Sequence, residues 1–487
     1  MHLRLSSLYE CGCDNCRTKI NLAADTKGKD FKSVLKAAEN AFKYLHEKGS
    51  YKAEDINDKP YQKLISETNN VLSEGLRDNV IPPAMLAKME NDTFIFSGLK
   101  THAQLLEANS FLRDEKGQIR SFDAFAYEFN KVNEKYNQNY LEAEHSFALR
   151  SSQMAANWAA TDPDGRYNLQ YRTANDDRVR ENHRALQDIT LPKEDSFWLS
   201  YYPPNGWRCR CTAVEVRKSK FELSDSEKAI QAGEKATSQI GKDGKNKLEI
   251  FRFNPGAEQK VFPPKHPYNK VKDAEIVKET LQKQSNQNSI EEKLNLKKGK
   301  EMTFDEANEL KGNINYAKGG GYTINCQSCV VSNELRRRGY DVTALENTRK
   351  SDNIPSQLSR KTNWAWIDKN GEMPKKQKAG GSLGIDNRGR TKTKTLNQLS
   401  KELGEITKEI GRYHIDFGWK RSNSGHIITL ERLESGFVKL YDPQNGKIVK
   451  WAELSKAISL RYGVNVLRVD NLDLNTEIVD GIVKKLD

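Results

Sequence analysis

The sequence has few apolar residues for its length. Of its 487 residues, 36% are hydrophobic, and the mean hydropathy is −0.81. No stretch approaches the roughly 20 apolar residues that a membrane-spanning helix needs, and the first residues lack the apolar core of a signal peptide. We therefore expect no membrane span, and two or three domains with long exposed helices and linkers instead of one compact enzyme.

Cysteine is also scarce. The chain has seven cysteines, and an odd number in so long a chain argues for a reducing compartment and against a disulfide framework. Three of them, Cys11, Cys13 and Cys16, lie close together near the start. A metal knuckle without an evident fourth ligand and a mobile tail with free thiols are both compatible with this cluster.

Acidic residues are outnumbered by basic ones. The chain has 79 lysines and arginines against 67 acidic residues, which gives a net charge of +12. Such a charge suits a protein that lies against nucleic acid or an acidic surface, although scattered lysines are more often a solvated surface. DNA contact is therefore one interpretation of the composition, and a solvated surface is the other.

The stretch from Tyr322 to Gly339 has the pattern of a helix that presents a reactive cysteine. Gly319–Gly321 interrupt the preceding structure, Cys326 stands where the helix should begin, and Gly339 follows a basic last turn. The free N–H groups and the positive dipole end at a helix N-terminus favour a thiolate. The pattern therefore predicts a nucleophilic cysteine.

A base and an orienting carboxylate follow downstream. The segment 424–431 is predicted to form a strand that contains His426, and 436–446 is predicted to form its hairpin partner, which contains Asp442. In an antiparallel hairpin that turns near Ser435 and Gly436, His426 and Asp442 lie toward the same open end. Asp442 would then orient the imidazole, and the imidazole would deprotonate the thiol.

These residues resemble a known family. The sequence has Asn-Cys-x-x-Cys-Val at 325–330, then Leu-Arg-Arg-Arg-Gly-Tyr-Asp-Val, Gly-His, and Tyr-Asp-Pro-Gln-Asn-Gly at 441–446. The order Cys, His, Asp is that of papain, and the segment from about Met302 to Leu454 resembles the papain-fold toxin domains of bacterial polymorphic toxin systems. That resemblance implies a protein glutamine deamidase that needs no cofactor for catalysis.

Two cysteines compete for the role of nucleophile. The helix-start position favours Cys326, whereas the papain motif, in which the second cysteine of Cys-x-x-Cys reacts, favours Cys329. The glutamine that precedes the papain nucleophile is replaced here by glycines, so backbone N–H groups, with help from Gln327 or Gln444, would stabilise the oxyanion. His414 is the alternative base and is less favoured because His426 has Asp442 as a partner.

A second block of motifs lies in the middle of the chain. The sequence has Arg-x-x-x-Asp-x-x-Val-Arg-x-x-His at 172–183 and Pro-Pro-x-x-Trp-x-Cys-Arg-Cys at 203–211. This order of residues closely resembles the phage Mu F-like minor head proteins, strongly over about 157–216. The resemblance implies a role in head morphogenesis, with phage portal and capsid proteins as partners.

This block also contains metal-binding residue types. His183, Cys209 and Cys211 offer three soft ligands for a structural zinc, and Asp176, Asp177 or the early thiols would supply a fourth. The alternative is a small fold in which His183 is hydrogen-bonded near a core of Phe197, Trp198 and Trp207. Four arginines are further candidates for contact with the portal or with DNA: Arg172, Arg178, Arg180 and Arg210.

The expected fold class is α+β with several domains. The composition becomes polar and charged after Val216, and a capping-box pattern at 303–306 predicts a new helix start. We expect a helical N-terminal region at 1–156, a small minor-head module at 157–217, a charged, partly disordered linker at 218–301 and a papain-like α+β domain at 302–487.

The combined resemblances imply a phage or prophage minor head protein with a C-terminal papain-like effector. Such a protein would be found in the virion head and in the host bacterial cytoplasm. The effector would hydrolyse an amide of a target protein, with glutamine deamidation as the favoured reaction. The alternatives are a cysteine protease and a structural head-morphogenesis protein whose papain-like domain is catalytically idle.

Overall fold

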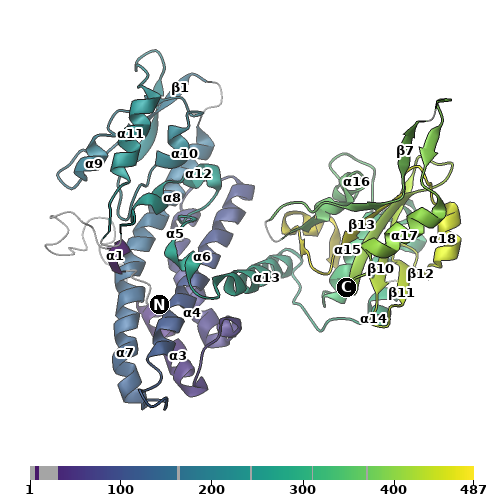
Figure 1. The fold of residues 1–487 in the computed structure, drawn as a ribbon, viewed down its shortest axis with the longest axis horizontal. Helices are drawn as coiled ribbons and strands as arrows, with labels where there is room; N and C mark the ends of the chain where they lie inside the picture. The colour runs from purple at the N-terminus through teal and green to yellow at the C-terminus, as the bar shows by residue number, and fades with distance from the viewer. Residues whose placement is uncertain are drawn as a thin grey trace. The chain divides into compact units, whose positions relative to one another are not determined.

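The protein has a mixed α+β fold with a helical N-terminal half and a β-rich C-terminal region (Figure 1). The computed structural model describes residues 6–9, 31–161, 165–241, 244–309, 311–368, 371–385 and 387–486. The chain divides into two compact units, Met1–Gln282 and Lys283–Asp487. None of the helices in these described ranges is long and apolar enough to cross a membrane.

Long helices form most of the first unit. They are α3 (Lys32–Lys48), α4 (Lys59–Leu72), α6 (Pro83–Ser110), α7 (Phe122–Glu134) and α8 (Leu141–Ala160), with a π-helical turn at Lys135–Tyr140 between the last two. The short helices α1 (Ser6–Tyr9) and α5 (Glu74–Arg77) accompany them. The apolar spacing of 33–45 and the proline-free stretch 122–157 predict helices at these places, and the structure has them there.

A buried ion pair lies among these helices. Lys100 Nζ is 2.7 Å from Glu144 Oε2, and both side chains are completely buried. The hydroxyl groups of Tyr9 and Tyr268 donate to Glu144 Oε1 at 2.6 and 3.1 Å. Because a buried carboxylate is costly without such partners, this network holds the first helix and the segment around Tyr268 in the same core.

The segment 218–301 differs from the expected linker. Its first part packs into the first unit: Phe251, Phe253 and Phe262 are buried, and Phe262 stacks on Phe96 with ring centroids 3.6 Å apart. The units divide within helix α13 (Ala274–Lys293). The low average hydropathy of the segment conceals these aromatic side chains, each of which buries a large apolar area.

A small antiparallel sheet forms a second core in the first unit. Its strand order is β2–β1–β3, with β1 at Tyr167–Arg172, β2 at Thr190–Leu191 and β3 at Thr212–Arg217. The helices around it are α9 (Glu181–Arg184), α10 (Phe197–Tyr201), α11 (Ser226–Ala236) and α12 (Pro255–Glu258). Phe197 and Trp198 are buried in this core, as the sequence predicts, whereas Trp207 belongs to the helical core.

A six-stranded antiparallel sheet organises the second unit. Its order is β12–β11–β10–β9–β13–β6. The strands run over Lys447–Ile448 (β12), Val438–Asp442 (β11), Gly425–Arg432 (β10), Gly411–Gly418 (β9), Val464–Arg468 (β13) and Gln377–Ala379 (β6). The hairpin of β10 and β11 turns at Gly436, which has a φ of +78° that suits glycine.

Helices and short strands complete the second unit. Helix α14 (Phe304–Asn308) begins with the predicted capping box, in which Thr303 and Glu306 bond to each other's backbone. The remaining elements are α15 (Cys326–Arg337), α16 (Ile354–Leu358), α17 (Leu396–Ile406), α18 (Trp451–Ala457), β4 (Val342–Ala344), β5 (Trp366–Ile367), β7 (Ser382–Ile385), β8 (Thr391–Thr393), β14 (Asp473–Leu474) and β15 (Val483–Lys485).

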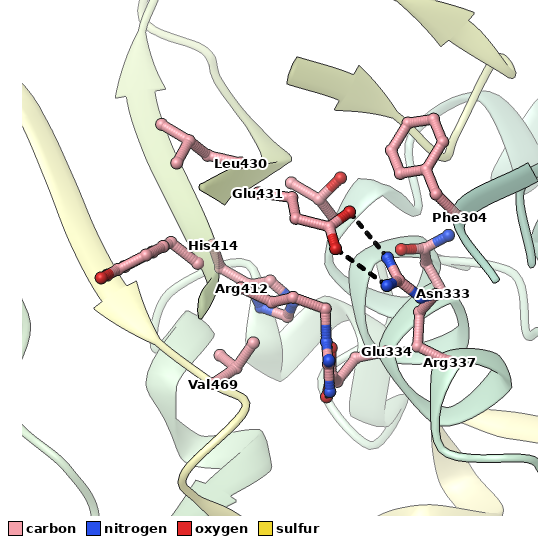
Figure 2. Close-up of a pocket in the computed structure, with 11 residues that line it drawn as sticks. Phe304, Asn333, Glu334, Arg337, Arg412, His414, Leu430, Glu431 and Val469 are labelled. Atoms are coloured by element: carbon pink, nitrogen blue, oxygen red, sulfur yellow. Dashed lines mark hydrogen bonds and ion pairs between the residues drawn. The ribbon is translucent and has the colours of Figure 1, made fainter. Parts of the chain in front are cut away.

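Charged contacts hold helix α15 against the sheet. Glu334 is buried and receives hydrogen bonds from Arg412 on β9 at 2.7 and 2.8 Å, and from Arg338 at 2.8 Å. One turn further on, Arg337 makes a bidentate pair with Glu431 on β10, at 2.8 Å for both bonds (Figure 2). Bidentate pairs of this kind fix orientation as well as distance.

The Glu334 contacts predict a pH dependence of stability. Burial raises the pKa of the Glu334 carboxyl, but Arg412 and Arg338 outweigh burial and lower the pKa to about 2 from its usual 4.5. The stabilisation is therefore complete above about pH 4.5 and is lost as the pH falls through about 2, and it amounts to about 3 kcal/mol. Unfolding measured between these pH values should show a smaller pH slope in Glu334→Gln than in the wild type.

The exposed Glu434 provides the matched control for this measurement. Glu434→Gln should keep the wild-type slope, because an exposed carboxylate contributes little. An unchanged slope in Glu334→Gln would contradict the assignment of the acid sensitivity to this cluster.

Candidate functional site

Cys326 is the first residue of helix α15, as the sequence predicts. Asn325 is the N-cap, and Gly339 follows the helix with a φ of +98°. The Cys326 side chain is 5% exposed. The first N–H groups of a helix have no partner within the helix, so Cys326 stands at the end of α15 where backbone donors are available and the helix dipole is positive.

His426 and Asp442 lie together on the sheet. His426 Nε2 is 2.8 Å from Asp442 Oδ2. In the hairpin Thr429 pairs with Tyr441, so Asp442 lies opposite Ile428, two residues from His426 and on the same face. The predicted partnership of these two side chains is present in the structure.

The surroundings of His426 favour its protonated form. Burial lowers the pKa of His426, but hydrogen bonds to Asp442 and to Cys326 outweigh burial and raise it to about 10. Because Nε2 faces Asp442, Nδ1 is the nitrogen available to the Cys326 sulfur. The Trp419 ring stacks on the imidazole with centroids 5.8 Å apart and restricts its rotation.

Cys329 has a different environment. It is completely buried one turn into α15, and its Sγ donates to Asn325 Oδ1 at 3.3 Å. Burial, together with the negative charges of Cys326 and Asp442, raises the pKa of the Cys329 thiol well above its ordinary value. A protonated thiol is a poor nucleophile, so the structure favours Cys326 over Cys329 for this role.

Buried amide side chains surround the Cys326 end of the helix. Asn313 Nδ2 donates to the Gln444 carbonyl at 2.9 Å, and Gln444 Nε2 donates to Asn325 Oδ1 at 3.4 Å. The Gln444 N–H and the Asn445 side chain donate to the two oxygens of Asp442 at 3.0 and 2.6 Å. Gln444 therefore supports Asn325 and Asp442, while Gln327 follows Cys326 and has a buried Oε1 without a protein partner in the described structure.

His414, the alternative base, lies at a different place. It lines a small pocket of about 10 Å³ together with Glu334, Arg412 and Val469 (Figure 2). Burial lowers the pKa of His414 to about 4. This space is about the size of one water molecule, so the pocket around His414 is too small for a peptide substrate.

The Cys326, His426 and Asp442 arrangement can support nucleophilic catalysis. A thiolate beside an imidazolium can attack a carbonyl carbon, and the imidazolium can then protonate the leaving group. Two residues of this site do not belong to the sequence motifs: Trp419, which stacks on His426, and Asn313, which donates to the Gln444 carbonyl. The only feature of the sequence that could have indicated Trp419 is the position of an aromatic residue directly after the strand that precedes His426.

The predicted metal ligands also come together. His183, Cys209 and Cys211 are buried, and their ligand atoms all lie within 4.8 Å of one another, so this group could hold a metal ion. His183 Nδ1 is 3.8 Å from Cys209 Sγ and 3.6 Å from Cys211 Sγ. Contact with Cys211 and His183 lowers the pKa of the Cys209 thiol.

The proposed fourth ligands do not join this group. Asp176 and Asp177 are not among its members within the described part of the chain, and Cys11, Cys13 and Cys16 lie outside that part. Both oxygens of Asp176 instead accept bonds from Arg210 at 2.6 Å, which lower the pKa of its carboxyl. The carboxylate of Asp176 is therefore occupied by a bidentate guanidinium partner.

The four arginines of this block have partners within the chain. Arg210 and Arg178 contact Asp176, Arg172 pairs with Asp188 at 3.0 Å, and Arg180 donates to the Trp207 carbonyl at 2.6 Å. Their contact with DNA or a portal stays a prediction.

The active-site geometry predicts selective alkylation of Cys326. At neutral pH, iodoacetamide should modify Cys326 faster than Cys329, because Cys326 lies beside His426, whereas Cys329 is completely buried and burial raises the pKa of its thiol. His426→Ala should slow the modification by about an order of magnitude or more. Peptide mass spectrometry measures the rates, with Cys329→Ala as the matched control. Faster labelling at Cys329 than at Cys326 would contradict the assignment of Cys326 as the reactive cysteine.

The comparisons with known proteins concern the first unit. The family of Phage Mu protein F like proteins matches residues 116–214. The putative capsid assembly protein F of Escherichia phage Mu is 45% identical over 53 residues, which cover 11% of this chain and 12% of the relative. The Mu-like prophage FluMu F protein of Haemophilus influenzae (strain ATCC 51907 / DSM 11121 / KW20 / Rd) is 38% identical over 80 residues, or 15% of this chain and 19% of the relative.

These matches cover less than a fifth of each relative. No solved structure matches the chain. The matched family region ends before the second unit, so the papain-like interpretation of that unit depends on its residues alone. Within the first unit, residues 116–214 form a Phage Mu F-like region.

Proposed function

We propose that the chain is a phage head-assembly protein whose second unit is a cysteine hydrolase acting on protein amides. The first part is supported by the Mu F-like region and by the name of the phage Mu relative, a putative capsid assembly protein. The partners of this part are phage portal and capsid proteins, and the chain is found in the virion head and in the host cytoplasm.

Phage heads purified from infected cells test the head-assembly part. Mass spectrometry should detect the full chain in assembled heads at a constant ratio to the major capsid protein. A chain that stays with soluble host proteins during head purification would contradict this part and would leave the hydrolase proposal untouched.

The hydrolase part is carried by one observation: the 2.8 Å contact of His426 with Asp442, beside Cys326 at a helix start. The Cys326 sulfur bonds to the amide carbon, and the amide oxygen becomes an oxyanion near the N–H groups of the helix start. His426 protonates the leaving nitrogen, which departs as ammonia from a glutamine side chain. The product of this half-reaction is a thioester.

Water completes the reaction. His426, now neutral, removes a proton from water, and the resulting hydroxide attacks the thioester carbon. The carbon–sulfur bond breaks and releases a carboxylic acid, which loses its proton to solvent, and Cys326 returns to its thiolate form with the first water proton on His426. Asp442 orients the imidazole during both halves. With a glutamine side chain as substrate the product is glutamate, and with a backbone amide the same steps cleave the chain.

The second candidate is a catalytically idle structural domain. It is favoured by the 5% exposure of Cys326, since a substrate amide has to reach the sulfur. A domain of this kind would retain the His426–Asp442 contact as an ordinary buried ion pair.

Expression of the full chain in a susceptible bacterium distinguishes these functions. Proteome-wide mass spectrometry should find glutamines converted to glutamates, a gain of about one mass unit that accompanies amide hydrolysis through a thioester. Cys326→Ala and His426→Ala should abolish the conversion, whereas Asp442→Asn should reduce it less, because the carboxylate only orients the base. Cys329→Ala is the matched control and should retain it.

New chain ends that depend on Cys326 would identify a protease instead of a deamidase. If the wild type produces neither converted glutamines nor new chain ends, the hydrolase proposal is contradicted and the idle domain is favoured. The same holds if Cys326→Ala produces these modifications as the wild type does.

A further inference from the structure

We propose that His183 Nδ1 and the thiolates of Cys209 and Cys211 bind one zinc ion that joins the two cores of the first unit. This inference concerns residues that the hydrolase does not use. The three side chains come from helix α9 and from the loop that leads into strand β3, so an ion held by all three cross-links segments that are 26 and 28 residues apart.

The distances fit a tetrahedral ion. With zinc–sulfur bonds near 2.3 Å and a zinc–nitrogen bond near 2.0 Å, tetrahedral geometry places nitrogen and sulfur ligands roughly 3.6 Å apart. The observed separations from His183 Nδ1 are 3.6 Å to Cys211 Sγ and 3.8 Å to Cys209 Sγ. Thiolate and imidazole ligands together select zinc over magnesium or calcium, which prefer oxygen.

The backbone conformation explains how two cysteines so close in the sequence can bind one ion. Cys209 and Cys211 are two residues apart, and an extended backbone directs such residues to the same side. Arg208 just before them has a φ of +57°, in the left-handed region that few residues other than glycine adopt. Such a conformation persists where surrounding contacts hold the backbone of the loop in place, and two ligands to a shared ion would provide such contacts.

A basic side chain lies beside the loop that holds the two cysteines. Arg180 acts electrostatically on both sulfur atoms and lies close enough to the loop to donate to the Trp207 carbonyl at 2.6 Å. The positive guanidinium would offset part of the negative charge that two zinc-bound thiolates bring into this core. The Tyr171 hydroxyl, also buried, donates to Asn205 at 3.0 Å and limits the space beside the cysteines.

The location of the cluster indicates a structural role. His183, Cys209 and Cys211 are only 2, 3 and 3% exposed, and the two cysteines belong to the small-sheet core. Trp207, two residues before Cys209, belongs to the helical core, where it stacks on Tyr9 with centroids 4.9 Å apart. An ion at Cys209 therefore holds the loop at the junction of the two cores. Water or another thiol of the chain would fill the fourth position.

Metal analysis of the full chain, purified without chelator, tests the proposal. Inductively coupled plasma mass spectrometry should find about one zinc per chain, the stoichiometry of a structural site. Cys209→Ser and His183→Ala should each lose the zinc, and Cys329→Ser is the matched control, since it places a hydroxyl at a buried thiol outside the cluster. Metal-free wild-type protein, or zinc that persists in Cys209→Ser, would overturn the proposal.

A second measurement avoids variants that fail to fold. Wild-type protein in which cobalt replaces zinc should show sulfur-to-cobalt charge-transfer absorption and the visible bands of a tetrahedral ion. Removal of the metal by a chelator should lower the unfolding temperature of the first unit and open the loop 203–210 to proteases. A cobalt spectrum without sulfur ligands would show binding elsewhere and would overturn the assignment to Cys209 and Cys211.

Discussion

The buried charge cluster around Glu334 determines where Cys326 lies relative to His426. A helix is a rigid rod, and Glu334 follows Cys326 by roughly 12 Å along the axis. Its bonds to Arg412 fix α15 on strand β9, and the Arg337–Glu431 pair fixes the next turn on β10. Since His426 lies on the same strand as Glu431, these contacts set the separation of Cys326 and His426.

Amide side chains supply the complementary constraint at the other end of the helix. Gln444 links Asn325, the residue before Cys326, to the backbone around Asp442. A buried polar network of this kind specifies one arrangement, because every alternative leaves donors or acceptors unsatisfied. The same network includes Cys329, whose Sγ donates to Asn325 Oδ1, whereas burial raises the pKa of the Cys329 thiol.

In the first unit, side-chain contacts join the small sheet to the long helices. The Mu F-like region begins at residue 116 and includes α7 and α8, although the motif residues begin near 172. The physical reason is packing: Trp207 contacts Phe147 on α8, and the Tyr202 hydroxyl donates to the Met154 carbonyl at 3.2 Å. The small sheet therefore does not form an independent module, and its family region includes the helices that cover it.

The local features of the second unit could be predicted from the sequence, because each depends on neighbouring residues: the helix that begins at Cys326, the β10–β11 hairpin and the capping box at Thr303. The sequence also placed His426 beside Asp442, since hairpin register is local. Three outcomes could not be predicted from the sequence: Phe251, Phe253 and Phe262 are buried in the core of the first unit, Asp176 binds Arg210, and Cys326 lies beside His426 while Cys329 does not. Those outcomes depend on burial and on partners far apart in the chain, which composition and spacing do not encode.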